Sequence, residues 1–350
     1  MQKKSNFSIL VFSRNDINEL LETLADVEGI SNDVVIIDSS DTAQRKKLDA
    51  YIKSKATKNI RVYGTIALGL AEIMRCYGYS KCKYDWVLQL DTDERISNEL
   101  KMDIPKIIKT ANCSAFAIKR YEDRKKGTAS PFFTWQLRLY NKAKIQYLGK
   151  LHEQPLINGR INHLDLSKYY LLHLEGNTRD YNKLEKFQRL TYGTLKMRLL
   201  DETSKFLMPA VRKKNSPLSE LLIRCFEVSR YLHAKKEHDE ITNSDYYFYY
   251  IMKYGIYHLK QRRFNPIPLL KNVSDMVSRI RKWRSEPDSE IGLRLSTIIE
   301  QEGMVKYLGL DNPKNMDALT KKYANFNIKG TDLLIYLLIK RYKEGKLNYA

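Results

Sequence analysis

The sequence predicts an α/β fold with a mostly parallel central sheet, followed by an α-helical C-terminal region. Short apolar runs alternate with amphipathic helical patterns in the first third of the chain. That alternation is typical of parallel strands joined by covering helices. From Arg179 onward only helical periodicity continues. We therefore expect an α/β domain over residues 1–200 and a helical domain over residues 201–350, linked by Lys213–Pro217, with a role in acceptor binding, membrane association or dimerisation.

The individual elements follow from the apolar pattern in chain order. A helical pattern begins behind Asn15 and Asp16, either of which would cap the helix. The expected β segments are Phe7–Phe12, Asp33–Ile37, Ile60–Tyr63, Trp86–Leu90, Ser114–Lys119, Phe132–Tyr140, Ile145–Pro155 and Tyr169–Leu174. The expected helices of the first domain are Ile17–Leu24, Gln44–Lys53, Leu68–Tyr77 and Asn98–Thr110. Those of the second are Asn182–Asp201, Leu218–Leu232, Asp245–Lys260, Pro268–Trp283, Ile291–Glu302 and Thr331–Glu344.

The most informative segment is Tyr84–Glu94, an apolar strand that ends in acids. Its apolar part, Trp86–Leu90, indicates a strand buried on both faces, and parallel sheets bind ligands beyond the carboxyl ends of such strands. Asp91 and Asp93 follow directly, and residues i and i+2 of an extended segment share a face. Both carboxylates could therefore meet one Mg²⁺ or Mn²⁺ that also binds phosphate. The alternative is a solvated turn that caps a helix.

A second strand, Asp33–Ile37, also ends in an acid, Asp38. This residue would lie at the same edge of the sheet as Asp91 and Asp93, where it could accept hydrogen bonds from a base or a ribose. The alternative for Asp38 is an Asx turn that closes the strand. Two acidic strand ends on one edge favour a site for a nucleotide and a metal.

Three polar residues near later strand ends are further candidates. His152, Glu153 and His173 could bind a metal or transfer a proton. For His173 the alternative is a structural role, because a single histidine in an apolar strand is commonly satisfied by local hydrogen bonds.

The amino-acid composition limits which binding partners and which cellular compartment can be expected. The formal net charge of +20 suits nucleic acid, an anionic membrane surface or phosphorylated substrates, and does not choose among them. The four cysteines have no C-x-x-C spacing, which argues against structural zinc and predicts a reducing compartment. No run approaches the ~20 apolar residues of a membrane span, and the first apolar run is too short for a signal peptide. We expect a cytoplasmic protein that could associate peripherally with the inner face of the membrane.

Taken together, these segments resemble the family-2 inverting glycosyltransferases of the GT-A fold, over residues 6–195. Ser8–Asp16 is similar to the family's first strand and its Arg-Asn-Glu turn, with Asp16 in the place of Glu. Val34–Thr42 is similar to the second strand with its Asp-Ser-x-Ser-x-Asp-x-Thr segment, shortened here. Tyr84–Glu94 resembles the D-W-[VI]-L-x-L-D-x-D-E motif closely and is the most specific match.

A later match points to a subgroup. Trp135–Tyr140 with Leu151–Glu153 is similar to the R-L-[FY] and [VL]-H-E motifs of a subgroup that includes lipopolysaccharide-core transferases. Leu68–Tyr77 departs from the family, because it lacks the usual small residues and Asn. The chain beyond residue 200 matches no family segment.

The resemblance implies transfer of a sugar, with inversion, from a nucleotide-diphosphate sugar to a hydroxyl of a glycan or lipid-linked acceptor. A UDP-sugar is the expected donor, and Mg²⁺ or Mn²⁺ the expected cofactor. The implied donor-binding residues are Arg14, Asn15, Asp38, Asp91 and Arg138. The implied metal ligands are Asp91, Asp93 and His173. The implied acceptor side holds His152 and Trp135, and the candidate bases are Glu153 first and Glu94 second.

Two other functions stay open at this stage. The same fold could bind nucleotides without transferring a sugar, as an inactive module. The positive charge could instead serve nucleic-acid binding, although the chain carries no recognised motif for it and no specific nucleic acid is expected. The helical C-terminal region is also compatible with a homo-oligomer.

Overall fold

The computed structural model describes residues 6–55, 59–123, 129–150, 153–174 and 289–344. The chain divides into two compact units, one of residues 1–183 with 299–350 and one of residues 184–298. The last helices therefore belong to the α/β unit, which differs from the expected division at residue 200. The helices expected between residues 182 and 283, and the linker, lie outside the described residues.

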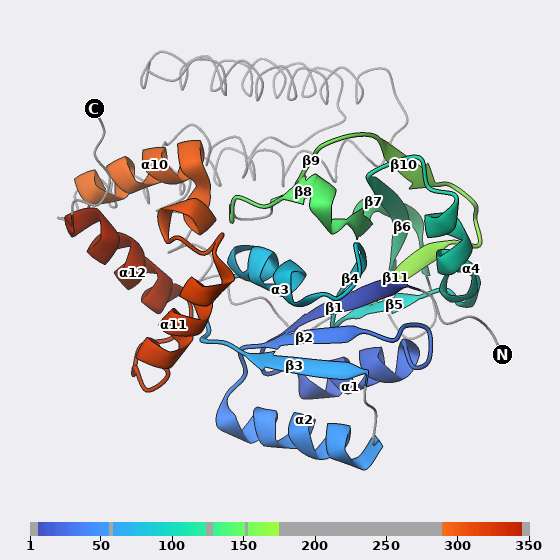
Figure 1. Ribbon diagram of the computed structural model, residues 1–350, viewed down its shortest axis with the longest axis horizontal. Helices are drawn as coiled ribbons and strands as arrows, with labels where there is room; N and C mark the ends of the chain where they lie inside the picture. Colours follow the sequence, from blue (N-terminus) through green and yellow to red (C-terminus); the bar gives the residue numbers. More distant parts are fainter. Residues whose placement is uncertain (1–5, 56–58, 124–128, 151–152, 175–288, 345–350) are drawn as a thin grey trace, which may run out of the picture. The chain divides into compact units, whose positions relative to one another are not determined.

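The described strands and helices are drawn in Figure 1. The strands are β1 (Phe7–Ser13), β2 (Val34–Asp38), β3 (Ile60–Gly64), β4 (Trp86–Asp91), β5 (Glu94–Ile96), β6 (Ala115–Asp123), β7 (Ala129–Asn141), β8 (Ile145–Gln146), β9 (Leu156–Ile157), β10 (Ile161–Leu164) and β11 (Tyr170–Leu174). The helices are α1 (Ile17–Asp26), α2 (Thr42–Lys55), α3 (Arg75–Lys81), α4 (Asn98–Lys109), α10 (Ser289–Tyr307), α11 (Pro313–Tyr323) and α12 (Thr331–Lys343), with short 3₁₀ turns at Glu72–Met74 and Lys142–Lys144.

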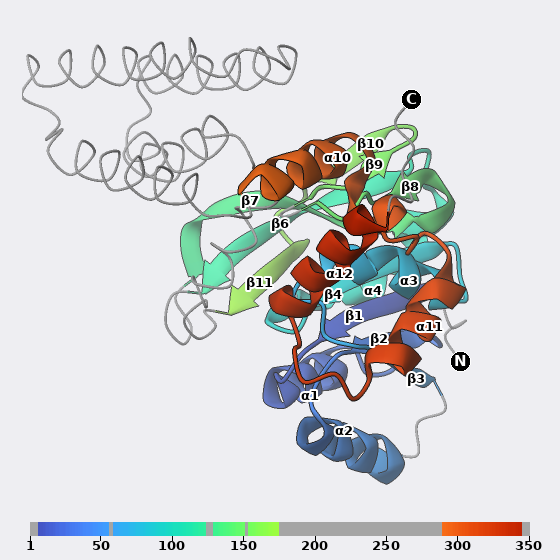
Figure 2. The same ribbon diagram turned by 90° about the vertical axis from the view of Figure 1, so that its left-hand side faces the viewer.

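Nearly all of these strands join one sheet in the order β3-β2-β1-β4-β7-β6-β11-β5, with β10 paired to β6. The first four strands are parallel, whereas β7 runs antiparallel to both of its neighbours. Figure 2 shows the same sheet from the side of its C-terminal helices. The expected fold class, α/β with a mostly parallel sheet and C-terminal helices, is confirmed.

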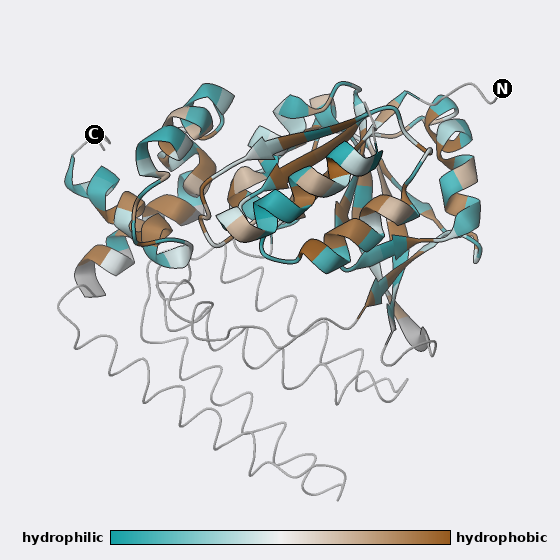
Figure 3. Cartoon of the chain, turned by 90° about the horizontal axis from the view of Figure 1, so that it is seen from below, coloured by the Kyte–Doolittle hydropathy of each residue, from teal (hydrophilic) through white to brown (hydrophobic). Residues whose placement is uncertain are grey.

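Both faces of the first strands are buried, which explains their continuous apolar runs. Ile9 and Val11 pack in a core with Leu20 and other apolar residues of α1. On the opposite face Gly78 of α3 lies against Leu10 and other side chains of β1 and β2, so close that an added Cβ would lie 3.0 Å or less from two of them. Figure 3 shows the hydrophobic residues gathered along the strands, with hydrophilic residues on the outer faces of the helices.

Two expected elements differ from the structure. The helix expected at Leu68–Tyr77 begins only at Arg75, after a 3₁₀ turn at Glu72–Met74. Gly69 has a non-helical φ of +85°, and a Cβ added there would lie 2.6 Å from the Thr331 nitrogen. The β structure expected over Ile145–Pro155 is limited to Ile145–Gln146. Helix α11 was not expected from sequence. Among its residues Met316 and Tyr323 are buried, and two apolar positions are too few to show helical periodicity.

The C-terminal segment is tied to loops of the α/β unit by close backbone contacts. Val305 N–H donates to Leu148 O at 2.9 Å, and Gly330 N–H donates to Ala67 O at 2.7 Å. Gly303, with φ +78°, lies where a Cβ would be 2.3 Å from the Leu148 oxygen. The positive φ and the close Leu148 oxygen together leave room only for glycine at residue 303. Among the described helices, none combines the length and the apolarity needed to span a bilayer.

Candidate active site

The candidate site lies where β1, β2 and β4 end. The strand order reverses at β1, because β2 and β3 extend from one side of it and β4 from the other. Open α/β sheets bind ligands at such a switch point. Thr92 Oγ1 donates to Asp16 Oδ2 at 2.5 Å and so joins the turns after β4 and β1. The hydroxyl-rich half of the site contains Ser13, Asn15, Asp38 and Ser40, and the charged half contains Asp91, Asp93, Glu94, Arg120, Glu122, Arg138 and His173.

In the hydroxyl-rich half, Asp38 is enclosed, with a side chain that is 2% exposed. Its Oδ1 accepts from the Ser40 backbone N–H at 3.2 Å and from the Ser40 hydroxyl at 2.6 Å. Its Oδ2 accepts from the Arg45 guanidinium at 3.1 Å. The bond to the N–H two residues on is the Asx turn that was the alternative from sequence, so this carboxylate closes its strand.

Asn15 ties the turn after β1 to the turn after β2. Its φ of 59° lies in the left-handed region, which Asn tolerates better than most residues. The Asn15 N–H donates to Ser40 Oγ at 2.8 Å, and Asn15 Oδ1 accepts from the Asp41 N–H at 2.9 Å. Arg14 is exposed, and its guanidinium lies against Gly330, where an added Cβ would be 3.0 Å from a terminal nitrogen.

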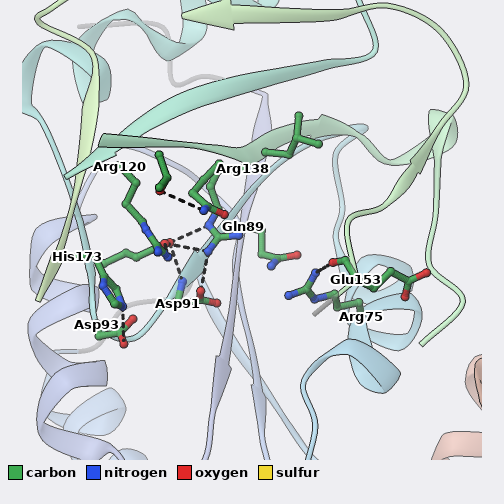
Figure 4. Close-up of polar contacts among 12 residues, drawn as sticks. Arg75, Gln89, Asp91, Asp93, Arg120, Arg138, Glu153 and His173 are labelled. Carbon is green, nitrogen blue, oxygen red and sulfur yellow. Dashed lines mark hydrogen bonds and ion pairs between the residues drawn. The ribbon is translucent and has the colours of Figure 1, made fainter. Parts of the chain in front are cut away.

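The centre of the charged half is Arg138, which β7 places there through a bulge. Phe116 pairs with Leu139 and Ala117 with Leu137, so Arg138 has no partner on β6. Bulges of this kind re-aim a side chain. Its guanidinium donates to both oxygens of Glu94 at 2.8 Å and to Asp91 Oδ2 at 2.6 Å (Figure 4).

This arginine–carboxylate cluster is withdrawn from solvent. Glu94 has no exposed surface. Burial alone would lower the pKa of Arg138, but Asp91 and Glu94 raise it well above its ordinary value, so the guanidinium stays charged. Buried charges are tolerated only when they are paired and hydrogen-bonded, which is the case here.

His173, on β11, lies between two carboxylates. Nδ1 is 2.6 Å from Glu122 Oε2, and Nε2 is 3.2 Å from Asp93 Oδ2. The hydrogen bond that the His173 ring donates to Asp93 raises the pKa of His173 to about 9, against the opposing effect of burial and with help from Glu122. Burial would raise the pKa of Asp93 and of Glu122, but the bonds and charge of His173 hold both below their ordinary values.

Arg120 completes the charged half by joining its two clusters. It lies 3.5 Å from Glu94 Oε1 and 3.1 Å from Glu122 Oε1. Four carboxylates therefore face two arginines and one histidine, and one carboxylate stays in excess even when His173 is protonated. Added positive charge would be favourable at this place.

The charged half offers ligands for a divalent cation. Within the described residues, no group of three or more His, Cys, Asp or Glu side chains is arranged as a metal centre. The turn at Thr92 also removes the extended geometry that was expected to align Asp91 with Asp93. However, Asp91 uses only Oδ2 for Arg138, and Glu122 holds His173 in the carboxylate–histidine arrangement that orients metal ligands.

The residues expected near an acceptor lie apart from the strand-end acids. Glu153 Oε1 accepts from the Leu148 N–H at 2.7 Å, and Oε2 accepts from the Gly149 and Lys150 N–H groups at 2.6 and 3.0 Å. This carboxylate therefore closes its own loop. Trp135 is exposed on β7 and stacks on His163 with ring centroids 4.5 Å apart. His152 lies outside the described residues.

Two residues of the charged half, and Arg75 beside the Glu153 loop, were not expected from sequence. Arg120 and Glu122 were assigned to a loop, because the strand was expected to end at Lys119, whereas β6 continues to Asp123. The available signal was the two-residue period of a strand, which places Arg120 and Glu122 on the same face as Ile118. Arg75 of α3 donates to the Glu153 carbonyl at 3.3 Å and stacks 4.9 Å from the Tyr147 ring centroid, a tertiary contact with no local signature.

Comparison with known proteins gives limited similarity. No protein-family model matches the chain. A protein named as an uncharacterized glycosyltransferase of Rickettsia typhi is 25% identical over 182 residues, covering 49% of this chain and 58% of the relative. A second, of Rickettsia conorii and named in the same way, is 27% identical over 180 residues, covering 47% and 59%. The chain thus spans less than two thirds of the length of these relatives.

Solved structures show only distant likeness. The S. aureus TarS 1–349 complex with UDP-GlcNAc has 14% identity and a TM-score of 0.39, and covers 91% of each chain. The TarS 1–349 complex with UDP has 18% identity and a TM-score of 0.35, over 49% of this chain and 61% of that one. GalNAc-T7 with UDP, GalNAc and Mn²⁺ has 22% identity and a TM-score of 0.29, over 35% and 24%. Values this low do not establish a shared fold.

Proposed function

We propose that the protein is a glycosyltransferase that moves a sugar from a nucleotide-diphosphate sugar to an acceptor hydroxyl, with inversion and with metal assistance. The observation that carries the proposal is the position of Asp91 and Asp93 at the end of β4, on the sheet edge that also holds Asp38, with His173 of β11 beside Asp93. The similarity to two proteins named as glycosyltransferases supports the same class. The GT-A, family-2 assignment rests on the motif around Asp91.

The two halves of the site suit the two ends of such a donor. The hydroxyl-rich half would bind the nucleoside, with Asp38 exchanging the Arg45 or Ser40 contact for a base or ribose donor. Arg14 would meet the diphosphate, because its guanidinium is exposed at the end of β1. A UDP-sugar is the first donor to test.

The charged half would hold Mg²⁺ or Mn²⁺ through Asp91, Asp93 and His173. A metal shared with a diphosphate needs only one or two carboxylates from the protein, because phosphate oxygens supply other ligands. When bound, the metal would stabilise negative charge on the leaving nucleoside diphosphate. Arg138 fixes the direction of Asp91, and Glu122 fixes the ring of His173 with Nε2 toward Asp93.

The acceptor base would come from the loop of Glu153. A general base must reach the proton that it removes. Glu94 has no exposed surface and gives both oxygens to Arg138, so it would act as a support for Asp91 and Arg138. Glu153 is partly exposed, and its Oε1 accepts only one N–H bond, which leaves capacity for an acceptor hydroxyl.

Calorimetric titration of UDP, GDP and CMP, with and without Mn²⁺, tests the proposal. We expect one nucleotide to bind in a Mn²⁺-dependent manner, and Asp93→Ala to lose the Mn²⁺ dependence while keeping the fold. Asp165→Asn is the matched control, because Asp165 is an exposed acid paired only with Lys119. Unchanged Mn²⁺-dependent binding in Asp93→Ala would refute the metal site, and absence of binding by every nucleotide would refute the function. Nucleotide binding without transfer to any acceptor would support the inactive-module alternative.

A further inference from the structure

The turn between α11 and α12 exposes a group of large apolar side chains. Ile328 is 46% exposed and Tyr336 is 38% exposed, on a part of the chain whose other large apolar residues are mostly buried. The Phe326 ring lies 5.3 Å from the Tyr336 ring and 5.4 Å from the Tyr323 ring. Tyr323 is itself buried, so the α11–α12 patch consists of the exposed side chains of Ile328 and Tyr336 with the partly exposed Phe326.

Positive charge surrounds this patch. Between residues 321 and 343 the chain has six basic residues and one acid, Asp332. The basic residues are Lys321, Lys322, Lys329, Lys340, Arg341 and Lys343. The Lys322 ammonium lies 5.7 Å from the Tyr323 ring centroid, and the Lys340 ammonium lies 5.9 Å from the Tyr336 ring centroid. Lys340 therefore borders the exposed Tyr336 ring directly, and Lys322 lies beside the neighbouring Tyr323.

We propose that the α11–α12 patch docks on the surface of an anionic lipid bilayer. Surface-bound protein segments combine apolar side chains that enter the headgroup boundary with Lys and Arg that meet anionic lipids. Tyrosine suits that boundary, because its ring is apolar and its hydroxyl stays hydrated. Ile328 and Tyr336 would enter the interface, and the surrounding lysines would bind the headgroups.

A comparison with helix α2 shows why a bilayer is a better partner for the patch than a soluble polyanion. Helix α2 also exposes lysines, at Lys46, Lys47 and Lys53, but none of its apolar side chains is a large exposed one. A surface that binds polyanions by charge alone needs no exposed Ile328. The α11–α12 patch combines lysines with exposed large apolar side chains, and this combination fits a membrane surface.

One end of the turn that carries the patch lies next to Arg14 of the candidate site in the fold. The turn that carries Ile328 ends at Gly330, whose α carbon lies against the Arg14 guanidinium. Docking at this turn would bring the Arg14 end of the site close to the bilayer, where a lipid-linked acceptor would be found. The docking surface itself rests on its own residues and not on the proposed transfer reaction.

Co-sedimentation of the full chain with vesicles tests the proposal. We expect binding to phosphatidylcholine vesicles that contain phosphatidylglycerol, weakening with salt, and no binding to phosphatidylcholine alone. A lysine near an anionic surface contributes roughly fivefold in affinity, so Lys321→Gln, Lys322→Gln and Lys329→Gln together should lower vesicle affinity on the order of 100-fold. Ile328→Ser should lower it by roughly tenfold without changing heparin binding.

Matched controls make the outcome specific to the patch. Lys46→Gln, Lys47→Gln and Lys53→Gln together remove the same charge elsewhere, and Leu166→Ser removes another exposed apolar side chain; both should leave vesicle binding within about twofold. Three outcomes would each overturn the proposal: an equal loss of vesicle affinity in the α2 variant, an unchanged vesicle affinity in Ile328→Ser, or no vesicle binding by the wild-type chain. Nucleotide titration of the same variants keeps this result separate from the test of transfer.

Discussion

The two halves of the candidate site hold their charged groups in different ways. In the hydroxyl-rich half, Asp38 is held by the hydroxyl and N–H of Ser40, two residues away, and by Arg45, which is partly exposed. In the charged half, Glu94 and Arg138 are withdrawn from water and come from different strands. One half is a set of local turns, in which the enclosed Asp38 is held by partly exposed donors. The other is a buried ion network whose members depend on one another.

This difference matters for ligand binding. The hydroxyl-rich half can release a hydrogen bond to a ligand at small cost, because its donors reach solvent. The charged half is pre-organised, because Arg138 and Glu122 already orient Asp91 and His173. We therefore expect mutations in the charged half to affect stability strongly, and mutations in the hydroxyl-rich half to affect it weakly.

The largest effect is expected for Arg138→Met. Removal of the guanidinium leaves Glu94 buried with only the longer contact to Arg120, and breaking a buried pair in this way costs about 3–5 kcal/mol. Urea denaturation at neutral pH measures this change in the free energy of unfolding. The double variant Glu94→Leu, Arg138→Met removes both charges and should be destabilised by less than Arg138→Met alone. A loss below about 1 kcal/mol in the single variant would show that Glu94 reaches water or another cation.

A pH-dependent effect in the charged half comes next. The pKa of His173 rises from 6.5 to about 9 on folding, through Asp93 and Glu122 and against Arg120. Because the folded pKa is the higher one, this stabilisation is complete below about pH 6.5 and is lost as the pH rises toward 9. At about 1.4 kcal/mol per pKa unit, it amounts to at most about 3.5 kcal/mol.

Urea midpoints of the metal-free protein, in the presence of a chelator, test this dependence. The wild-type chain should lose stability between pH 6.5 and 9, and His173→Gln should lose much less over the same interval. His163→Gln is the control, because His163 stacks on exposed Trp135 outside the charged half. If His163→Gln removes the pH dependence of stability and His173→Gln retains it, the titrating group is not His173.

In the hydroxyl-rich half, Arg45→Met should cost only about 1 kcal/mol. Asp38 keeps both bonds from Ser40, and the lost Arg45 contact is partly exposed. The same denaturation measurement, compared directly with Arg138→Met, tests the contrast between the halves. Equal losses in the two variants would mean that Asp38 is as dependent on its arginine as Glu94 is, and the contrast would fail.

Most of the fold could be predicted from sequence, because the strands of a doubly covered sheet are apolar throughout. The strand-end acids Asp38 and Asp91 followed from the same runs. The network around Arg138 could not be predicted, because a bulge in β7 sets its direction and the register of β7 with β6 sets its neighbours. The base candidates Glu94 and Glu153 show the same limit, since spacing reveals neither the burial of one nor the backbone bonds of the other.

A comparably small effect is expected where the two halves meet. Thr92 Oγ1 donates to Asp16 Oδ2, and Thr92→Val removes this bond while keeping the shape of the side chain. The Thr92 carbonyl still accepts from Thr23 and Arg95, so the turn should persist. We expect a loss of about 0.5–1.5 kcal/mol in the free energy of unfolding, typical of a single hydrogen bond.

A double-mutant cycle with Asp16→Asn measures whether this bond couples the halves. Asp16 also accepts from Ser13 Oγ and the Arg14 N–H, so Asp16→Asn alone should cost more than Thr92→Val. If the bridge joins the halves, the two losses should fall short of additivity by at least about 0.5 kcal/mol, and Thr92→Val should weaken Mn²⁺-dependent nucleotide binding more than it weakens binding without Mn²⁺. Additive losses with equal effects on both kinds of binding would mean that each half holds its own part of the donor independently, and that the turn after β4 is positioned by Arg138 alone.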